Sequence, residues 1–427
     1  MKMNSRVALF VVALLFAAVE MKAQESSAVR PRTVAGAAQA QQTPAQAAAA
    51  QIAAPLPKPA DTETGLPVIV PESQKKLAEP ITRFTPSVIQ TRISEARRML
   101  KTRPVPTASV PSIEFVTIAA LDRESARTHF ITLSKETFLT KGAEVNTTTS
   151  EGTNVNVRIV RANGVNTALT IFTQDGKSLA PLTVEYPIER GGKFLETAYY
   201  TSAHPALLSP DLVHSGQSYV RNMLDLAVKR LRDKGVTISP EIVDVAERLC
   251  VVEHVDHDRF RNENRLALYD EIYSLFALNE LDTYRFSVSS AGAGGMVQMI
   301  PWAYNLLRTR YPGVGLIPDF VTGMRNHANA LQAMLLYMKD TWSDLTANDE
   351  VMYALNAKLA TPSELLAAGY NSNAAKLPLY LKRGGDSWRT LIPRETQMYL
   401  QIYKSFEALV PIQSRTADQN GLKADLR

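Results

Sequence analysis

Apolar and polar residues alternate with a period of two over much of residues 113–202, a pattern that predicts short β-strands. The clearest run covers residues 155–159, and the turn sequences Asn163-Gly164 and Asp175-Gly176 follow it. Short strands separated by such turns are typical of a small antiparallel sandwich. We therefore expect a β-sandwich-like module here, and its composition offers no obvious cluster of catalytic side chains.

The apolar pattern changes to a helical period after Ser209-Pro210, and helices are expected from there to about residue 410. The first has an apolar stripe of seven residues: Tyr219, Val220, Met223, Leu224, Ala227, Val228 and Leu231. Ser239-Pro240 begins a second helix, and a third runs from Arg265 to Asn279. The expected buried face of the third consists of Leu266, Tyr269, Ile272, Tyr273, Phe276 and Ala277. This helix delivers Glu280 at its C-terminal end.

A shorter helix is expected to begin at Thr85-Pro86, because Thr is a good N-cap and Pro suits the first turn. Four apolar residues share one of its faces: Ile89, Ile93, Ala96 and Leu100. Its end is basic, with Arg97, Arg98, Lys101 and Arg103. A membrane-surface role is open for this basic end, although a solvated helix face is the simpler interpretation.

The N-terminal residues predict export. Lys2 and Arg6 precede an apolar run over residues 7–19, and the small residue Ala23 ends the segment, as in a signal peptide of residues 1–23. An uncleaved anchor is the alternative. Residues 24–84 are rich in Ala, Gln, Pro and Thr and are expected to form a disordered tether, and residues 411–427 a polar tail. The expected location is therefore periplasmic or secreted.

Charge and cysteine content exclude some classes of protein. The net charge of +5 is too weak to indicate a nucleic-acid partner, but it favours association with an anionic cell wall or membrane surface. The single cysteine, Cys250, allows no internal disulfide and lies far from the signal region, so no acylation site is expected. We expect it to pack as a small apolar residue in a helix.

A loop of small residues, 289–295, separates Glu280 from the sequence Gly295-Met296-Val297-Gln298. This stretch resembles the goose-type lysozyme and soluble lytic transglycosylase (SLT domain) family, in which a catalytic Glu-Ser pair is followed at fixed spacing by a Ser/Ala/Gly loop and a Gly-Leu-Met-Gln motif. Glu280-Leu281 stands at the position of the pair, so Leu281 replaces the Ser.

Three later motifs follow in the order of that family, so the resemblance covers residues 266–409. Asn326-His327-Ala328-Asn329-Ala330 lies where the family has Asn-Ile-x-x-Gly. Residues 367–373 are similar to its Ala-Tyr-Asn-Ala-Gly motif, with Tyr370 and Asn371 retained, and residues 392–399 are similar to its Glu-Thr-x-x-Tyr ending, with Tyr399.

The resemblance implies an α+β multidomain protein, with a C-terminal all-α lysozyme-like domain (203–410) preceded by the helix and β-sandwich-like module (85–202). It implies a lytic transglycosylase that cleaves peptidoglycan glycan strands between N-acetylmuramic acid and N-acetylglucosamine with 1,6-anhydro products, and it implies no cofactor and no metal. Glu280 would act as acid and then base. The expected substrate-binding residues are Gln298, Met296, Val297, Tyr370, Asn371 and Tyr399, with Tyr399 close to Glu280.

The position of Glu280 also suits a proton donor on physical grounds. A carboxylate at a helix C-terminus lies near the negative end of the helix dipole, and apolar neighbours add to the cost of its charge. Both effects favour the protonated form near neutral pH, as a general acid requires.

A second polar cluster has the composition of a metal site: Glu253, His254, Asp256, His257 and Asp258. Its spacing matches no closed zinc motif, and we expect a solvated or capping cluster.

Two alternatives to the transglycosylase remain open. A catalytically silent peptidoglycan-binding protein is favoured by Leu281. A hydrolytic muramidase would need a second acid to activate water, and Asp282 and Glu395 are the candidates.

Overall fold

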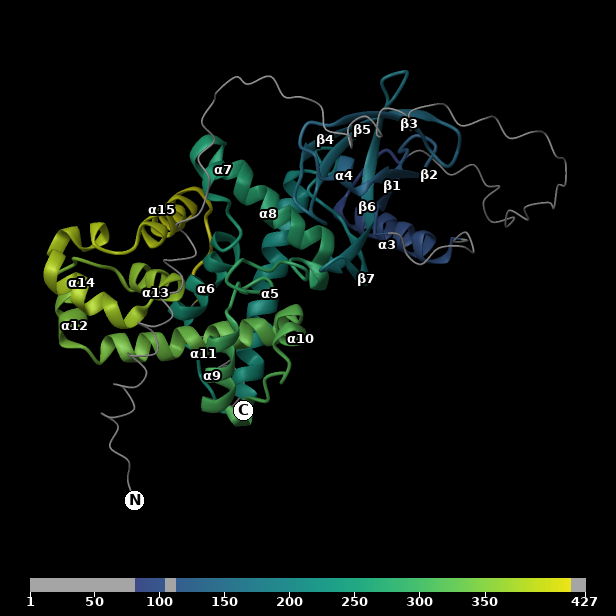
Figure 1. Ribbon diagram of the computed structural model, residues 1–427. Helices are drawn as coiled ribbons and strands as arrows, with labels where there is room; N and C mark the ends of the chain where they lie inside the picture. Colours follow the sequence, from purple (N-terminus) through teal and green to yellow (C-terminus); the bar gives the residue numbers. More distant parts are fainter. Residues whose placement is uncertain (1–80, 104–112, 416–427) are drawn as a thin grey trace, which may run out of the picture. The chain divides into compact units, whose positions relative to one another are not determined.

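The computed structural model describes residues 81–103 and 113–415, which belong to one compact unit beginning at Leu77 (Figure 1). The expected signal peptide, most of the expected tether and most of the expected tail lie outside these residues. Among the helices in the described ranges, none has the length and apolar character needed to cross a membrane.

The strand-rich part consists of one antiparallel sheet and a short helix. Its strands are β1 (Phe115–Leu121), β2 (Thr128–Ser134), β3 (Glu144–Thr148), β4 (Asn154–Arg161), β5 (Ala168–Thr173), β6 (Ser178–Arg190) and β7 (Lys193–Tyr200), with the short helix α4 (Lys135–Phe138) after β2. The turns expected at Asn163-Gly164 and Asp175-Gly176 do connect β4 to β5 and β5 to β6. Gly164 and Gly176 adopt positive φ, the conformation that tight turns require.

The expected two-sheet sandwich is instead one nearly closed sheet with the order β2-β1-β6-β5-β4-β3 and with β7 paired to β6. The reason is the length of β6. Its first residues pair with β5 (Ser178 with Phe172), while its later part pairs with β7 (Val184 with Tyr200), so one strand belongs to both halves. Apolar side chains from both halves then share one interior, which includes Phe138 of α4.

The first helix, α3 (Pro86–Thr102), begins where the sequence predicts. The Thr85 side chain accepts a hydrogen bond from the Val88 backbone N–H, and the four predicted apolar residues are buried. Its basic end is only partly a solvated face, because Arg97 lies 3.6 Å from Asp282 and Arg103 pairs with Glu185 of β6.

The helical part contains helices of 6 to 24 residues, and the longest connection between them is the irregular segment 283–300. The helices are α5 (Pro210–Asp233), α6 (Pro240–Val252), α7 (His257–Asn262), α8 (Arg265–Asn279), α9 (Pro301–Arg310), α10 (Phe320–Arg325), α11 (His327–Thr346), α12 (Asp349–Asn356), α13 (Pro362–Asn371), α14 (Leu377–Gly384) and α15 (Arg394–Leu409). Single 3₁₀ turns are η2 (Glu280–Asp282), η3 (Pro312–Val314), η4 (Ala374–Lys376) and η5 (Gly385–Thr390).

Helix α8 connects the sheet to the other helices. Its residues Tyr273 and Phe276 belong to the core of the helical part, Leu275 to the interior of the sheet, and Leu278 to a third cluster with α3. All residues from Ser274 to the end of α8 are buried, as expected of a helix with apolar residues all round. Leu266, in its first turn, is exposed and does not join the expected buried face.

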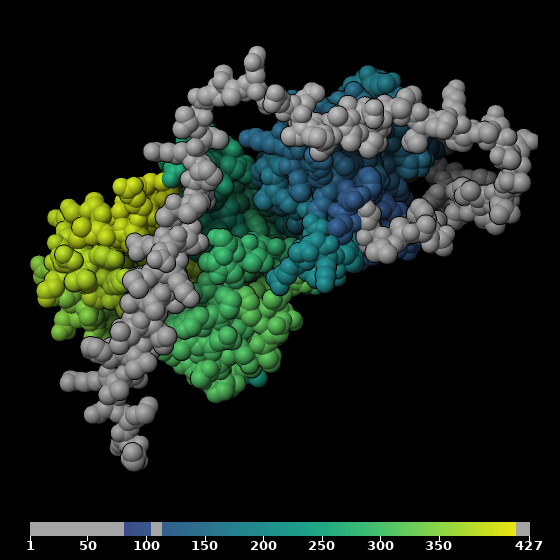
Figure 2. Space-filling model, in the orientation of Figure 1, coloured from purple at the N-terminus to yellow at the C-terminus, as the bar shows by residue number. Residues whose placement is uncertain are grey.

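Polar contacts reinforce this junction. The Asn279 side chain accepts a hydrogen bond from the Thr201 N–H at 2.9 Å and donates one to the Thr201 carbonyl at 2.7 Å. Figure 2 shows the surface of the sheet residues adjoining that of the helical residues. The structure therefore does not separate an all-α domain from the sheet.

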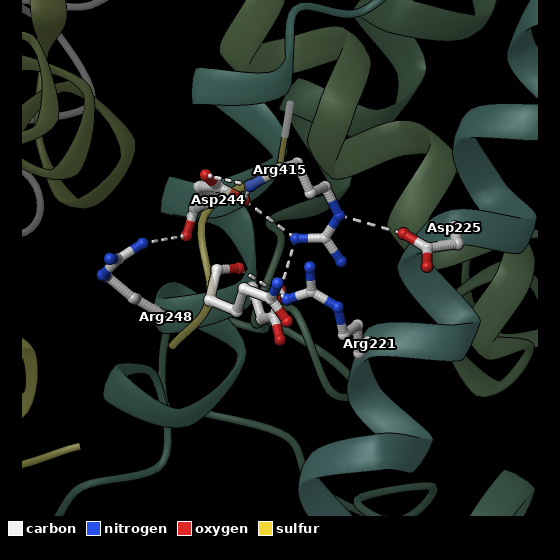
Figure 3. Close-up of polar contacts among 7 residues, drawn as sticks. Arg221, Asp225, Asp244, Arg248 and Arg415 are labelled. Atoms are coloured by element: carbon white, nitrogen blue, oxygen red, sulfur yellow. Dashed lines mark hydrogen bonds and ion pairs between the residues drawn. The ribbon is translucent and has the colours of Figure 1, made fainter. Parts of the chain in front are cut away.

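Ion pairs connect Arg415, the last described residue, to helices α5 and α6 (Figure 3). The Arg415 guanidinium lies 3.0 Å from Asp225 and 3.0 Å from Asp244, and it also pairs with Glu247. Arg221 reaches both Glu247 and the backbone near the C-terminal end. Since Arg415 is 6% exposed, this is a buried cluster.

Candidate active site

Glu253 occupies the end of α6 and faces a cavity. Its backbone N–H closes the helix on Leu249, and its side chain is partly buried. The Tyr399 hydroxyl, from α15, donates a hydrogen bond to Glu253 Oε1 at 2.5 Å. Segments that are far apart in the sequence thus place a carboxyl group and a phenol in direct contact.

The surroundings of Glu253 favour its protonated form. Burial raises the pKa of Glu253 to about 8, and the negative charge of Glu395 acts in the same direction, while the hydrogen bond from Tyr399 opposes them. A carboxyl group with such a pKa carries its proton at neutral pH, so it can act as a general acid.

The turn Gly295-Met296-Val297-Gln298 lies beside this carboxyl group. Gly295 has φ +67°, and a Cβ there would lie 2.4 Å from the Met324 carbonyl, so the position requires glycine. Two side chains bind consecutive carbonyls of the turn. His254 Nε2 lies 2.8 Å from the Met296 oxygen, and the Tyr370 hydroxyl donates to the Val297 oxygen at 2.6 Å.

The side chains of Met296 and Val297 do not face the cavity. Both are 0% exposed and belong to the core of the helical part, so the structure gives them a packing role in place of the expected sugar contact. Their backbone carbonyls carry the contacts to His254 and Tyr370.

Gln298 lines the cavity, and its side-chain oxygen Oε1 is left to bind a ligand. Its Nε2 donates to Ser287 Oγ at 3.1 Å and to the Gly295 carbonyl at 2.8 Å. Both amide hydrogens are therefore engaged, and no donor among the described residues reaches Oε1. Gln298 can thus accept a hydrogen bond from a ligand N–H or O–H group.

The cavity has a volume of about 830 Å³, within the usual range for ligand sites. Its helical side includes Glu253, His254 and Gln298, and the end of β4 with the connection that follows it, residues 160–166, lines another side. An ion-pair chain joins the two sides. Arg161 of β4 pairs with Glu271 of α8, and the Arg259 guanidinium donates two bonds to the same carboxylate at 3.0 and 2.9 Å.

Two of the remaining predicted residues, Tyr370 and Tyr399, form hydrogen bonds with groups of the site. Tyr370 is bound to the turn, and Tyr399 is bound to Glu253 and not to Glu280. Asn371, the last residue of α13, is partly buried and does not line this cavity.

Glu280 lies in a different environment from the other predicted residues. It ends α8 with φ +47°, it is exposed, and it lines a shallow pocket with residues of α3: Gln90, Thr91, Ser94, Glu95 and Arg98. Leu281, which follows it, is 60% exposed. The structure therefore groups Gln298, Tyr370 and Tyr399 with Glu253.

The polar cluster 253–258 divides into separate roles. Asp256 caps α7 by accepting a hydrogen bond from the Arg259 N–H at 2.8 Å, as the capping interpretation predicts. Across the described residues, no group of three acidic, histidine or cysteine side chains could hold a metal ion. Glu253 was expected to be solvated or to cap a helix, and its place in the cavity was missed.

The sequence did contain a signal for Glu253. A Glu-His pair ends an apolar helix there, as a Glu-Ser pair would. The spacing to Gly295 favoured Glu280 because α7 and α8 lie between Glu253 and the small-residue loop in the chain.

Comparison of the chain with protein-family models, with curated proteins and with solved structures found no match.

Proposed function

We propose that this protein is a peptidoglycan lytic transglycosylase in which Glu253 is the acid and base, on a helical part of lysozyme-like architecture. The observation that carries the proposal is the contact of the buried Tyr399 with Glu253, which lines one cavity together with Gln298. The resemblance of four ordered motifs supports the same activity, and export to the periplasm or cell exterior remains its expected setting.

The proposed reaction begins with proton transfer. Glu253 gives its proton to the glycosidic oxygen between muramic acid and glucosamine as the bond from C1 to that oxygen breaks. The resulting carboxylate then takes the proton from the 6-hydroxyl group of the muramic acid while O6 forms a bond to C1. The nucleophile belongs to the substrate, so the ring closure is intramolecular and no water is consumed.

Other acids in the cavity are already occupied. Glu263 and Glu271 both bind Arg259, and Asp256 caps α7. An inverting or retaining hydrolase needs a second carboxylate free to activate water or attack the sugar. The cavity therefore favours the transglycosylase over a hydrolase.

In the hydrolytic alternative, Glu395 is the candidate for the second acid. It lies one helical turn before Tyr399 in α15, is exposed, and its charge acts on Glu253. Asp282 is a weaker candidate, because it lies 3.6 Å from Arg97 and 3.5 Å from Arg285 beside Glu280.

Digestion of purified sacculi in water labelled with ¹⁸O separates these functions. The proposal predicts muropeptides with 1,6-anhydro ends, lighter than hydrolysis products by one water and resistant to borohydride. Reducible ends carrying ¹⁸O would identify a hydrolase, with Glu395→Gln as the next variant. Binding to sacculi without release of any muropeptide would identify a silent binding protein.

A further inference from the structure

His254 immediately follows Glu253 and is held in a defined orientation. Its ring stacks face to face on the Tyr284 ring, with 3.4 Å between centroids and 3° between planes. Both rings line the same cavity as Glu253 and Gln298.

The hydrogen bond of His254 fixes its tautomer. Nε2 lies 2.8 Å from the Met296 carbonyl oxygen, which can only accept, so Nε2 carries the proton. Burial also lowers the pKa of His254 to about 3, so the ring stays neutral at any pH at which Glu253 works. A neutral ring whose Nε2–H is engaged cannot be the proton donor to substrate, and the bond from Nε2–H to the Met296 carbonyl gives it a positioning role.

The turn that His254 holds contains a strained residue. Gln298 has φ +45°, which is uncommon for a residue with a side chain and persists only where neighbours impose it. The neighbours here are His254 on the Met296 carbonyl and Tyr370 on the Val297 carbonyl. These two consecutive carbonyls immediately precede Gln298, so they help to fix the backbone from which its side chain extends, while Ser287 and the Gly295 carbonyl hold the amide nitrogen.

We propose that His254 is a positioning residue that, through the Met296 carbonyl and its stack on Tyr284, keeps Gln298 Oε1 available to the N–H of an acetamido sugar. The inference rests on the proposed function, since that function supplies the acetylated sugar. It makes His254 a determinant of selectivity for glycans that carry an acetamide N–H, acting through the turn without contacting the reacting atoms.

Calorimetric binding to two β-1,4 tetramers tests this role in the Glu253→Gln background, which prevents turnover: one tetramer is of N-acetylglucosamine, and in the other each acetamide nitrogen is methylated, which keeps the acetyl group and removes the N–H. His254→Phe keeps an aromatic ring for the stack and removes the donor. It should raise the Kd for the unmethylated tetramer about tenfold and leave that for the N-methylated tetramer nearly unchanged. His254→Gln restores an N–H donor and should recover part of the selectivity.

His214→Phe is the matched control, because His214 is exposed on α5 away from the cavity. If His254→Phe is folded and keeps the selectivity of its parent, the inference is wrong. If His254→Phe does not fold, the comparison is made with Tyr284→Leu, which removes the stack, and unchanged selectivity in that variant also contradicts it. Failure of the unmutated protein to release muropeptides from sacculi would instead reject the proposed function on which the inference rests.

Discussion

The hydroxyl of Tyr399 and the carboxyl of Glu253 lie 2.5 Å apart although 146 residues separate them in the chain. A phenol that donates to a carboxyl oxygen stabilises the charged form more than the neutral one, so it lowers the pKa of the acid. Because of this contact, single substitutions should change the pKa of Glu253, the proposed catalytic group.

Tyr399→Phe and Glu395→Gln should shift the basic limb of the pH profile of kcat/KM in opposite directions. Activity requires protonated Glu253 and should fall as the pH rises through about 8 in the unmodified protein. Tyr399→Phe removes an interaction that lowers the pKa, so the limb should move up by about one pH unit. Glu395→Gln removes a negative charge that raises the pKa, so the limb should move down. Shifts of the same sign would show that Glu253 does not control the limb.

The raised pKa of Glu253 should also appear in stability. The folded protein holds this proton up to about pH 8, whereas an unfolded Glu releases it near its ordinary pKa of 4.5. Between these values the folded state binds more protons, so this group's contribution to the free energy of unfolding falls as pH rises, by at most about 1.4 kcal/mol per pH unit. Glu253→Gln should therefore gain stability relative to the unmodified protein from pH 5 to pH 8, measured by urea denaturation. A difference that does not change with pH would contradict the raised pKa.

Removal of Arg415 should destabilise the whole described unit. The substitution Arg415→Met leaves Asp244 and Glu247 without the guanidinium that neutralises them, and breaking a buried ion pair costs about 3 kcal/mol or more. Lys229→Met breaks an exposed pair with Asp233 and should cost less than about 1 kcal/mol. Equal losses in urea denaturation would show that the cluster in Figure 3 contributes little.

Helices α5 and α8 meet at Gly216. A Cβ at this position would lie 1.9 Å from the Tyr273 carbonyl oxygen, so Gly216→Ala must push the two helices apart. We expect a loss of about 2 kcal/mol or more from overpacking, with a lower midpoint in thermal unfolding. Gly313→Ala is the control, since nothing lies within 4 Å of its added Cβ and its backbone is unstrained. A Gly216→Ala protein as stable as this control would contradict the close approach.

Helix starts were predictable because their signals are local. Thr85-Pro86 and Ser209-Pro210 begin α3 and α5, where the Thr85 and Ser209 side chains accept hydrogen bonds from backbone N–H groups three residues on. The turns at Gly164 and Gly176 are equally local. By contrast, the role of β6 in joining both halves of the sheet depends on pairing between distant strands, which the alternating pattern does not specify.

The sequence allowed us to predict several residues around the candidate site, but not its central carboxyl group, Glu253. The motifs identified Gln298, Tyr370 and Tyr399, and the structure places contacts of these residues around Glu253. Spacing along the chain favoured Glu280, because α7 and α8 separate Glu253 from the turn in sequence although both line one cavity in the fold. Only tertiary contacts distinguish two carboxyl groups that each follow an apolar helix.

The most direct test compares Glu253→Gln with Glu280→Gln in the release of muropeptides from purified sacculi. Each substitution removes a transferable proton and keeps the size of the side chain. The account predicts that Glu253→Gln lowers the initial rate by a factor of at least about 10³, while Glu280→Gln stays within about threefold of the unmodified protein. A Glu253→Gln protein with normal turnover, or a Glu280→Gln protein without any, would contradict it.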